Sequence, residues 1–285
     1  MGNIRIVTDS TADIPADVRE KYGITMVSLK VLFGEETYRD AVDMTTDDFY
    51  ARLKSSSVMP TTSQPSPAEF SDVYERLLAE DPTGPIISIH LASVLSGTYQ
   101  SATIARSMIE AEDANITVID SKSASSGHGM LVVLAAKMAQ DGASVEEILA
   151  AIEERRQYAE VFFLVDTLEY LQKGGRIGKA AALIGSLLNI KPILSLDEAG
   201  AVYSADKARG SKKAMSKIVE LLKAAYGDAP VGLIVAKTDD PMNAKELETR
   251  VTAELNVKEI HYTAVGTVIG THTGPGTSAV FLYKV

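Results

Sequence analysis

The sequence predicts an α/β protein with two domains. Short β-branched runs alternate with helical segments over the first 160 residues, a pattern typical of a parallel sheet covered by helices on both faces. After residue 160 the pattern changes, and a turn sequence at 197–200 between two apolar runs indicates at least one antiparallel pair of strands. We therefore expect an N-terminal three-layer α/β/α domain with a parallel sheet at 1–160 and a C-terminal α/β domain with a mixed sheet at 161–285.

The elements of the first domain follow from β-branched runs and from signals at helix ends. The first run precedes a helix that Ser10 or Asp13 is expected to cap and Gly23 to end. Thr45 marks the start of another helix. Strands are expected at 4–7, 25–32, 85–89 and 116–119, and helices at 13–22, from 45, at 68–79, 98–109 and 129–140 and from 144, with an irregular loop at 60–67.

The second domain is expected to combine further strands and helices. Strands are expected at 161–165, 191–196, 201–203, 231–236, 260–265 and 279–283, and helices at 180–188, 211–225 and 243–255. The segment at 180–190 has almost no polar face, which is typical either of a buried helix or of a cavity wall. No Pro/Ser-rich linker joins the domains, so we expect them to pack closely with a cleft between them, a common place for a ligand.

The composition excludes several classes of protein. The net charge of -10, from 28 basic and 38 acidic residues, leaves no basic stripe that could replace phosphate counterions, so nucleic acid is not an expected partner. No apolar run approaches the roughly 18 residues that span a bilayer, and the first residues resemble a strand rather than a signal peptide. The absence of cysteine excludes disulfides, thiolate zinc sites and cysteine nucleophiles. We expect a cytoplasmic protein without a transmembrane segment.

The loop around Ser96 is the sharpest local signal for a site. A strand ends before this loop, and Ser96 and Gly97 open the next helix. The first backbone N–H groups of a helix have no partner within it and can bind an anion, while glycine permits close approach. In an open α/β sheet, this carboxyl end of a strand is where ligands collect. The alternative is that Ser96 only caps the helix.

Three further segments carry polar side chains suited to an anion. Thr61 and Thr62 lie in the proline-stiffened segment PTTSQPSP, which is either the mouth of a pocket or an ordinary surface loop. His272 stands between two threonines in IGTHTGPG, whose glycines predict a loop, and is either a structural donor or part of a site. Arg176 in the segment KGGRIG either neutralises an acid or is solvated.

These side chains favour a protein that holds a small anion over one that breaks a bond. Hydroxyls, one imidazole and one guanidinium can grip a carboxylate or phosphate, but the sequence has no G-x-S-x-G motif of a serine nucleophile. A rival hypothesis is a serine hydrolase that uses Ser96 and His272, with Asp9 or Asp120 orienting the imidazole. A phosphosugar or nucleotide enzyme would need a phosphate-binding loop, which the sequence lacks, and the four histidines show no metal-ligand spacing.

An ordered set of motifs through essentially the whole chain resembles the DegV family. The motifs are TDSTAD at 8–13, PTTSQPSP at 60–67, LSGTYQSA at 95–102, DSKSAS at 120–125, LEYLQKGGRIG at 168–178, NIKPIL at 189–194, the stretch at 207–209 and GTHTGPG at 270–276. The resemblance implies a bacterial fatty-acid-binding protein, the FakB-type subunit of a fatty acid kinase. It further implies a fatty acid buried between the two domains, and a separate ATP-binding kinase subunit that makes an acyl-phosphate for phospholipid synthesis.

The resemblance also implies roles for particular residues. Thr62 and Ser96 should contact the fatty-acid carboxylate. The other residues implied at the carboxylate are Thr61, Ser93, Gly97, His272 and Arg176. Arg209 matches a basic position that docks the kinase partner. No catalytic residue, metal or cofactor beyond the bound fatty acid is implied. In one departure from the family pattern, Ala92 replaces the first of two serines before Leu-Ser-Gly-Thr, which removes a hydroxyl but keeps Ser93.

Overall fold

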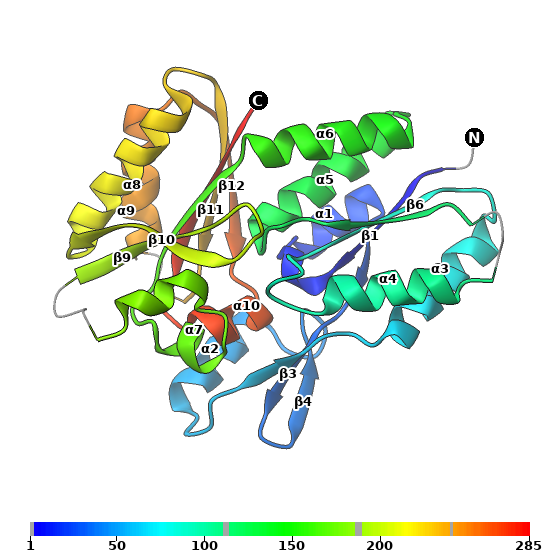
Figure 1. The fold of residues 1–285 in the computed structure, drawn as a ribbon, viewed down its shortest axis with the longest axis horizontal. Helices are drawn as coiled ribbons and strands as arrows, with labels where there is room; N and C mark the ends of the chain where they lie inside the picture. Colours follow the sequence, from blue (N-terminus) through cyan, green and yellow to red (C-terminus); the bar gives the residue numbers. More distant parts are fainter. Residues whose placement is uncertain (1–2, 111–113, 186–189, 240–241) are drawn as a thin grey trace.

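The computed structural model describes residues 3–110, 114–185, 190–239 and 242–285, and these form three sheets (Figure 1). The first sheet is parallel throughout, with the order β2-β1-β6-β7. Its strands are β1 (Arg5–Asp9), β2 (Thr25–Val27), β6 (Ile86–His90) and β7 (Ile116–Asp120). The parallel sheet predicted for the first domain is confirmed.

Helices cover both faces of this parallel sheet. They are α1 (Ala16–Tyr22), α3 (Pro67–Glu80), α4 (Thr98–Met108), α5 (Ser126–Gln140) and α6 (Val145–Gln157). Successive side chains of a strand point to opposite faces, so neighbours in β1 enter different cores. Val7 packs with Phe70 of α3, whereas Ile6 packs with Leu131 of α5. The predicted three-layer arrangement is therefore confirmed.

The second sheet is mixed and has six strands, in the order β10-β9-β8-β13-β11-β12. Its strands are β8 (Glu160–Leu164), β9 (Ile190–Leu196), β10 (Val202–Arg209), β11 (Val231–Lys237), β12 (Val257–Ala264) and β13 (Ser278–Lys284). Only β11 and β12 pair in parallel, and the other neighbours are antiparallel. The mixed sheet and the antiparallel pair across the turn at 197–200 are thus confirmed.

The two faces of the mixed sheet have different neighbours. The helices α8 (Ser211–Tyr226) and α9 (Met242–Glu254) cover one face, away from the N-terminal half (Figure 1). The other face contributes Phe163 and Phe281 to the same core as Leu131 of α5. We call this second face the bare sheet face. It packs against α5, which lies between the two large sheets.

A small antiparallel sheet, with the order β4-β3-β5, lies beside both large sheets. It consists of β3 (Lys30–Phe33), β4 (Glu36–Arg39) and β5 (Thr61–Ser63), and α2 (Thr46–Ser55) accompanies it. Its core joins Val31 and Phe49 to Val268 of α10 (Thr267–Thr273), with Tyr170 of α7 (Glu169–Lys173) at its margin. This packing carries residues of the N-terminal half against the C-terminal half.

Several sequence-based expectations for local structure are wrong. The strand expected at 25–32 is two strands, β2 and β3, in different sheets. The supposed loop at 60–67 contains β5, because Thr62 pairs with Val31 of a strand far away in the sequence. The segment around His272 is the short helix α10 rather than a loop. These elements depend on tertiary contacts, which a local pattern does not record.

The start of α1 also differs from the expectation. Pro15, rather than Ser10 or Asp13, occupies the N-cap position of α1, while Gly23 ends the helix in the left-handed conformation as predicted. Ser10 lies in a short 3₁₀ helix and accepts a hydrogen bond from the backbone of Leu29. The carboxylate of Asp13 faces Ser125 and Gly266 instead of α1.

The apolar segment at 180–190 is not the long helix that its composition suggested. A 3₁₀ helix occupies Gly178–Leu183, β9 begins at Ile190, and the expected residues 186–189 lie outside the described part of the chain. The division of the chain at residue 160 stays a prediction. The strand β8 of the mixed sheet begins at Glu160, while the small sheet from the first half packs on α10 from the second.

Candidate functional site

A cavity lies between the bare face of the mixed sheet and the loops at the carboxyl ends of the parallel strands. Its sheet wall is apolar and consists of Val161, Phe163, Leu196, Val202, Ala279 and Phe281. Its empty space is about 830 Å³, including space that is open to solvent.

Four polar residues predicted from the sequence line this same cavity: Thr62, Ser96, Arg176 and His272. They come from β5, the β6–α4 loop, the turn after α7, and α10. Oγ1 of Thr62 lies 2.9 Å from Nε2 of His272. The guanidinium of Arg176 donates to the carbonyl of Leu95, the residue before Ser96, at 3.0 Å. These contacts gather the four side chains at one end of the cavity.

The position of His272 is fixed from the first turn of α10. Two buried carboxyl groups from the N-terminal half meet this turn. The hydroxyl of Thr267 donates to Asp40 at 2.7 Å, and the backbone N–H of Gly266 donates to Asp13. Burial raises the pKa of Asp13 well above its usual value, and burial also raises the pKa of Asp40. The helix that carries His272 is thus anchored by contacts that do not involve the cavity.

His272 is held as a neutral imidazole. Burial, and to a lesser degree the positive charge of Arg176, lower the pKa of His272 to about 4. Its Nδ1 atom is buried and has no hydrogen-bond partner among the described residues. An unpaired buried polar atom costs free energy, which a ligand that supplies a partner would recover. Nδ1 lies against Gly174, where an added Cβ atom would clash with it, so the lack of a side chain at Gly174 makes room for the ring.

Arg176 contributes a positive charge at the same end. Besides the carbonyl of Leu95, its guanidinium donates to the carbonyl of Gly174 at 2.7 Å. No carboxylate forms an ion pair with Arg176 in the part of the chain that the structure describes. Two carbonyls orient the group without neutralising it, so its charge remains available to an anion in the cavity.

Ser96 lines the cavity and also forms a hydrogen bond with Thr98, the first residue of α4, whose N-cap residue is Gly97. Oγ of Ser96 lies 2.9 Å from Oγ1 of Thr98 and accepts a hydrogen bond from the backbone N–H of Thr98 at 3.3 Å. Gly97 does not line the cavity. A Cβ atom at Gly97 would lie 2.4 Å from Oε1 of Gln64, so the absence of a side chain there makes room for Gln64. The β5 segment thereby packs on the Ser96 loop.

Other residues assigned from the sequence lie outside the cavity. Thr61 and Ser93 are exposed, and Ser93 uses its backbone N–H to contact the carboxylate of Asp120. Arg209 is exposed at the end of β10, in a separate hollow with Lys191 and Ser211. The structure therefore brings together four of the seven residues implied at the carboxylate and separates Thr61, Ser93 and Gly97 from them.

Sequence reasoning missed three hydroxyl residues that line the cavity: Ser125, Thr273 and Thr277. The hydroxyl of Thr277 donates to the carbonyl of Gly274 at 2.9 Å, and that of Ser125 donates to Asp13 at 2.5 Å. A signal existed for two of them, because Thr273 lies in the same glycine-rich segment as His272 and Thr277 directly follows it. Considering every hydroxyl in and next to that segment would have found them.

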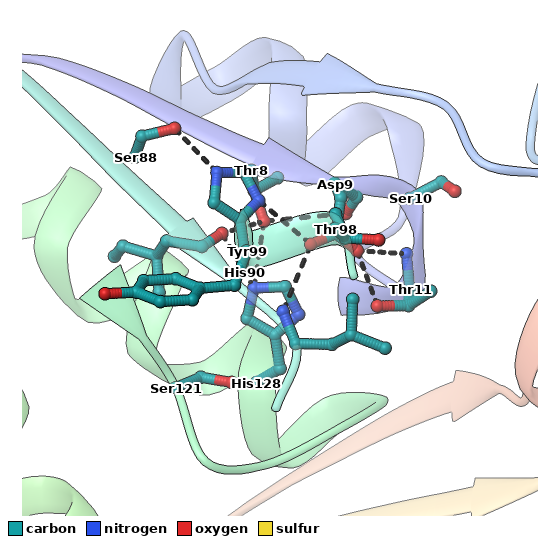
Figure 2. A network of polar contacts seen from close by, with 12 residues as sticks. Thr8, Asp9, Ser10, Thr11, Ser88, His90, Thr98, Tyr99, Ser121 and His128 are labelled. Carbon is teal, nitrogen blue, oxygen red and sulfur yellow. Dashed lines mark hydrogen bonds and ion pairs between the residues drawn. The ribbon is translucent and has the colours of Figure 1, made fainter. Parts of the chain in front are cut away.

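A second histidine cluster lies inside the parallel sheet and is fully buried (Figure 2). Oδ2 of Asp9 lies 3.0 Å from Nδ1 of His90, and Nε2 of His90 lies 2.7 Å from Oγ of Ser88. The other carboxylate oxygen accepts from the hydroxyl of Thr11 at 2.5 Å. Burial alone would raise the pKa of Asp9, but His128, His90 and these hydrogen bonds hold it at about 2.

The structure does not bring together the side chains that the rival serine-hydrolase hypothesis requires. Asp9 orients His90 rather than His272, and the carboxylate of Asp120 accepts from backbone N–H groups, including that of Lys122. The cluster Asp9–His90–Ser88 has the residue types of a catalytic triad, yet all three side chains are buried and none lines the cavity. A sealed serine has no access to a substrate.

Two absences among the described residues bear on the site. Among the residues that the structure describes, no group of three or more His, Cys, Asp or Glu side chains could hold a metal ion. No described helix is both long enough and apolar enough to cross a lipid bilayer.

Solved structures of bacterial proteins share this fold. A DegV family protein from Thermus thermophilus, described as binding fatty acid, has a TM-score of 0.92 and 38% identity, with 99% of this chain and 100% of that chain covered. A stearic-acid-binding protein from Eubacterium ventriosum has a TM-score of 0.89 and 31% identity, with 100% of this chain and 98% of that chain covered. The two-domain α/β fold is therefore that of fatty-acid-binding DegV structures.

The sequence comparisons agree over the whole length. A DegV domain-containing protein from Caldanaerobacter subterraneus subsp. tengcongensis is 41% identical over 284 residues, which cover 99% of each chain. The family model described as "Uncharacterised protein, DegV family" matches residues 3–285. With a match of this extent and relatives of this similarity, the chain belongs to the DegV family.

Proposed function

We propose that this protein binds a long-chain fatty acid in the cavity, with its carboxylate at Thr62, Ser96, His272 and Arg176. One observation carries the proposal: a single cavity has an apolar sheet face along its wall and four neighbouring side chains that can bind an anion. Relatives described as binding fatty acid, including the one described as binding stearic acid, support it.

The energetics of such a ligand suit this cavity. Each buried CH₂ group contributes about 0.8 kcal/mol, so a 16-carbon tail supplies roughly 10 kcal/mol before ordering costs. An unpaired carboxylate in a dry site is very costly. The charge of Arg176, two hydroxyls and the imidazole of His272 offset that cost. In this proposal the four side chains hold the carboxylate by charge and hydrogen bonds, so the carboxylate stays chemically intact.

We further propose that the bound acid is presented, in the cytoplasm, to a separate kinase subunit that uses ATP to form an acyl-phosphate for phospholipid synthesis. The resemblance of the motifs to FakB-type subunits supports this role. Arg209 is the docking residue in this proposal, and its exposed position outside the cavity suits it to a contact with a partner. The chain itself contributes no catalytic residue and no cofactor to the reaction.

The first test identifies the bound lipid. It then distinguishes residues that bind the carboxylate from the residue proposed to dock the kinase subunit. Protein purified under native conditions is extracted with organic solvent and analysed by mass spectrometry, and a long-chain fatty acid is expected. Thr62→Ala and Ser96→Ala should weaken retention, whereas Arg209→Ala should spare retention and slow acyl-phosphate formation with a kinase subunit.

Two matched controls accompany the two variants of the carboxylate site. Thr61→Ala and Ser93→Ala remove hydroxyls from the same two segments but outside the cavity, so they should retain lipid like the wild type. No lipid in the extract, together with no uptake of added palmitate or oleate, would refute fatty-acid binding. Equal retention in all five variants would refute the assignment of the carboxylate site alone.

A further inference from the structure

The mixed sheet provides a ladder of side chains that leads away from the polar end of the cavity. Along β13 and the segment before it, Thr277, Ala279 and Phe281 line the cavity in turn, each one pleat further from His272. Phe281 is paired with Val161 on β8. The antiparallel pair Phe163–Leu194 between β8 and β9 places Leu196 level with Val161. Phe281, Val161 and Leu196 therefore form one row across three adjacent strands. Along β13, this is the row of the cavity, called the channel from here on, that lies furthest from His272.

Phe281 also closes the gap between the two halves of the molecule. Its ring packs against Gly127 in the first turn of α5, where an added Cβ atom would lie 3.1 Å from Cδ1 and 3.2 Å from Cε1 of the ring. The side chain of Phe281 is only 3% exposed. The ring thus spans the space between the sheet and α5 at the level of this row.

A second hollow begins on the other side of the same row. It shares Val161, Leu196 and Phe281 with the channel, so these three side chains form the wall between the two spaces. Beyond the wall its lining is largely polar and includes Lys122, Glu153, Arg156, Gln157, Glu160 and Glu198. A methyl terminus that passed the wall would leave apolar surroundings for charged side chains and water.

We propose that Phe281, seated on Gly127, is the end stop of the acyl channel and sets the longest straight chain that the protein binds well. This inference rests on the proposed function and adds to it the selection of ligands by chain length. Within the channel each added methylene improves affinity roughly fourfold, because its apolar surface is buried. Once the methyl terminus meets the Phe281 ring, a further methylene gains nothing and displaces packed side chains.

The test measures the dissociation constant for saturated straight-chain fatty acids that differ in steps of two carbons. For the wild type, affinity should rise by roughly fifteenfold per step and then stop rising at one length. Phe281→Ala removes the ring and should move that length upward by at least one step. Ala279→Leu adds bulk one pleat nearer to His272 and should move it downward, which gives a second, independent variant.

The control is Phe162→Ala. Phe162 is the neighbour of Val161 on β8 but points to the opposite face, where it packs with α8 and α9. It should lose stability like Phe281→Ala while keeping the wild-type length limit. An unchanged limit in both Phe281→Ala and Ala279→Leu, with a wild type that binds fatty acids, would overturn the end-stop proposal alone. A wild type that binds no fatty acid of any length would overturn the proposed function instead.

Discussion

The two histidine clusters of this protein use similar residue types for opposite purposes. His90 lies between Asp9 and Ser88, fully buried, with both ring nitrogens paired. Among the described residues, His272 makes one side-chain hydrogen bond, to the hydroxyl of Thr62, and it lines a cavity. An unpaired nitrogen does not by itself distinguish the two clusters, because Nδ1 of His128 in the buried cluster is unpaired like Nδ1 of His272. The difference teaches that a polar cluster sealed inside the fold stabilises it, whereas a polar cluster that faces a cavity is available to a ligand.

The largest effect on stability is expected for a substitution of Asp9 in the buried cluster. Asp9→Ala leaves Nδ1 of His90 and the backbone N–H groups of Thr11 and Leu91 without their acceptor. Each buried donor left without an acceptor costs roughly 1–3 kcal/mol, so the three together cost several kcal/mol. We expect a loss of that size in the free energy of unfolding, measured by urea denaturation.

His272→Ala is the matched control for Asp9→Ala, because it removes a polar contact from the other cluster. It should change the free energy of unfolding by less than about 1 kcal/mol, since His272 makes a single hydrogen bond. Similar losses for the two variants would show that the cavity cluster is structural as well.

The next prediction concerns ligand affinity rather than stability. His272→Ala and Thr62→Ala should each weaken fatty-acid binding by about ten- to a hundredfold, because a hydrogen bond to a charged group contributes roughly 1.5–3 kcal/mol. Isothermal titration calorimetry with a single fatty acid measures the change. Ser88→Ala, the corresponding change in the buried cluster, should lower stability but leave the affinity of the folded protein unchanged. A large loss of affinity in Ser88→Ala would contradict the separation of the two clusters.

How far each cluster could be foreseen from the sequence follows from its contacts. The hydroxyl, imidazole and guanidinium segments were visible as motifs, and Thr62, Ser96, Arg176 and His272 do share one cavity. The pairing of Asp9 with His90 was not foreseen, because it joins the ends of two strands that are 81 positions apart. Local patterns in a single sequence do not show which distant residues meet in the fold.

The secondary structure shows the same contrast between features with local sequence signals and features that depend on distant contacts. Helices with strong local signals, such as α3 with its Ser66–Glu69 capping box, were predicted within about one residue at each end. The strand β5 and the helix α10 were missed, since three and seven residues carry too little periodicity to identify an element. Both exist because the small sheet and the C-terminal half pack on each other through Val31, Phe49 and Val268. The sequence pattern therefore predicts the layers well and the junction between them poorly, and the site lies at the junction.

The smallest effect, and the one that sharpens the comparison most, is a shift in the titration of His272. In the free protein its pKa is lowered to about 4 by burial and by Arg176, so the ring is neutral at neutral pH. Its folded pKa lies below the unfolded value near 6.5, so this group costs stability as pH falls from about 6.5 to 4, where only the unfolded state takes up the proton. A bound carboxylate favours the protonated ring and should raise the pKa of His272.

NMR titration of the imidazole signals, with and without a saturating fatty acid, measures this shift. His90 has no contact with the ligand in the proposed complex, and its signals should not respond to lipid. His272→Gln identifies the signals of His272 by their loss. If the fatty acid leaves the titration of His272 unchanged while binding in the cavity, then the carboxylate does not contact His272, and this part of the site assignment is wrong. A shift confined to His272 shows instead that the carboxylate binds beside the imidazole that lines the cavity, and not beside the buried His90.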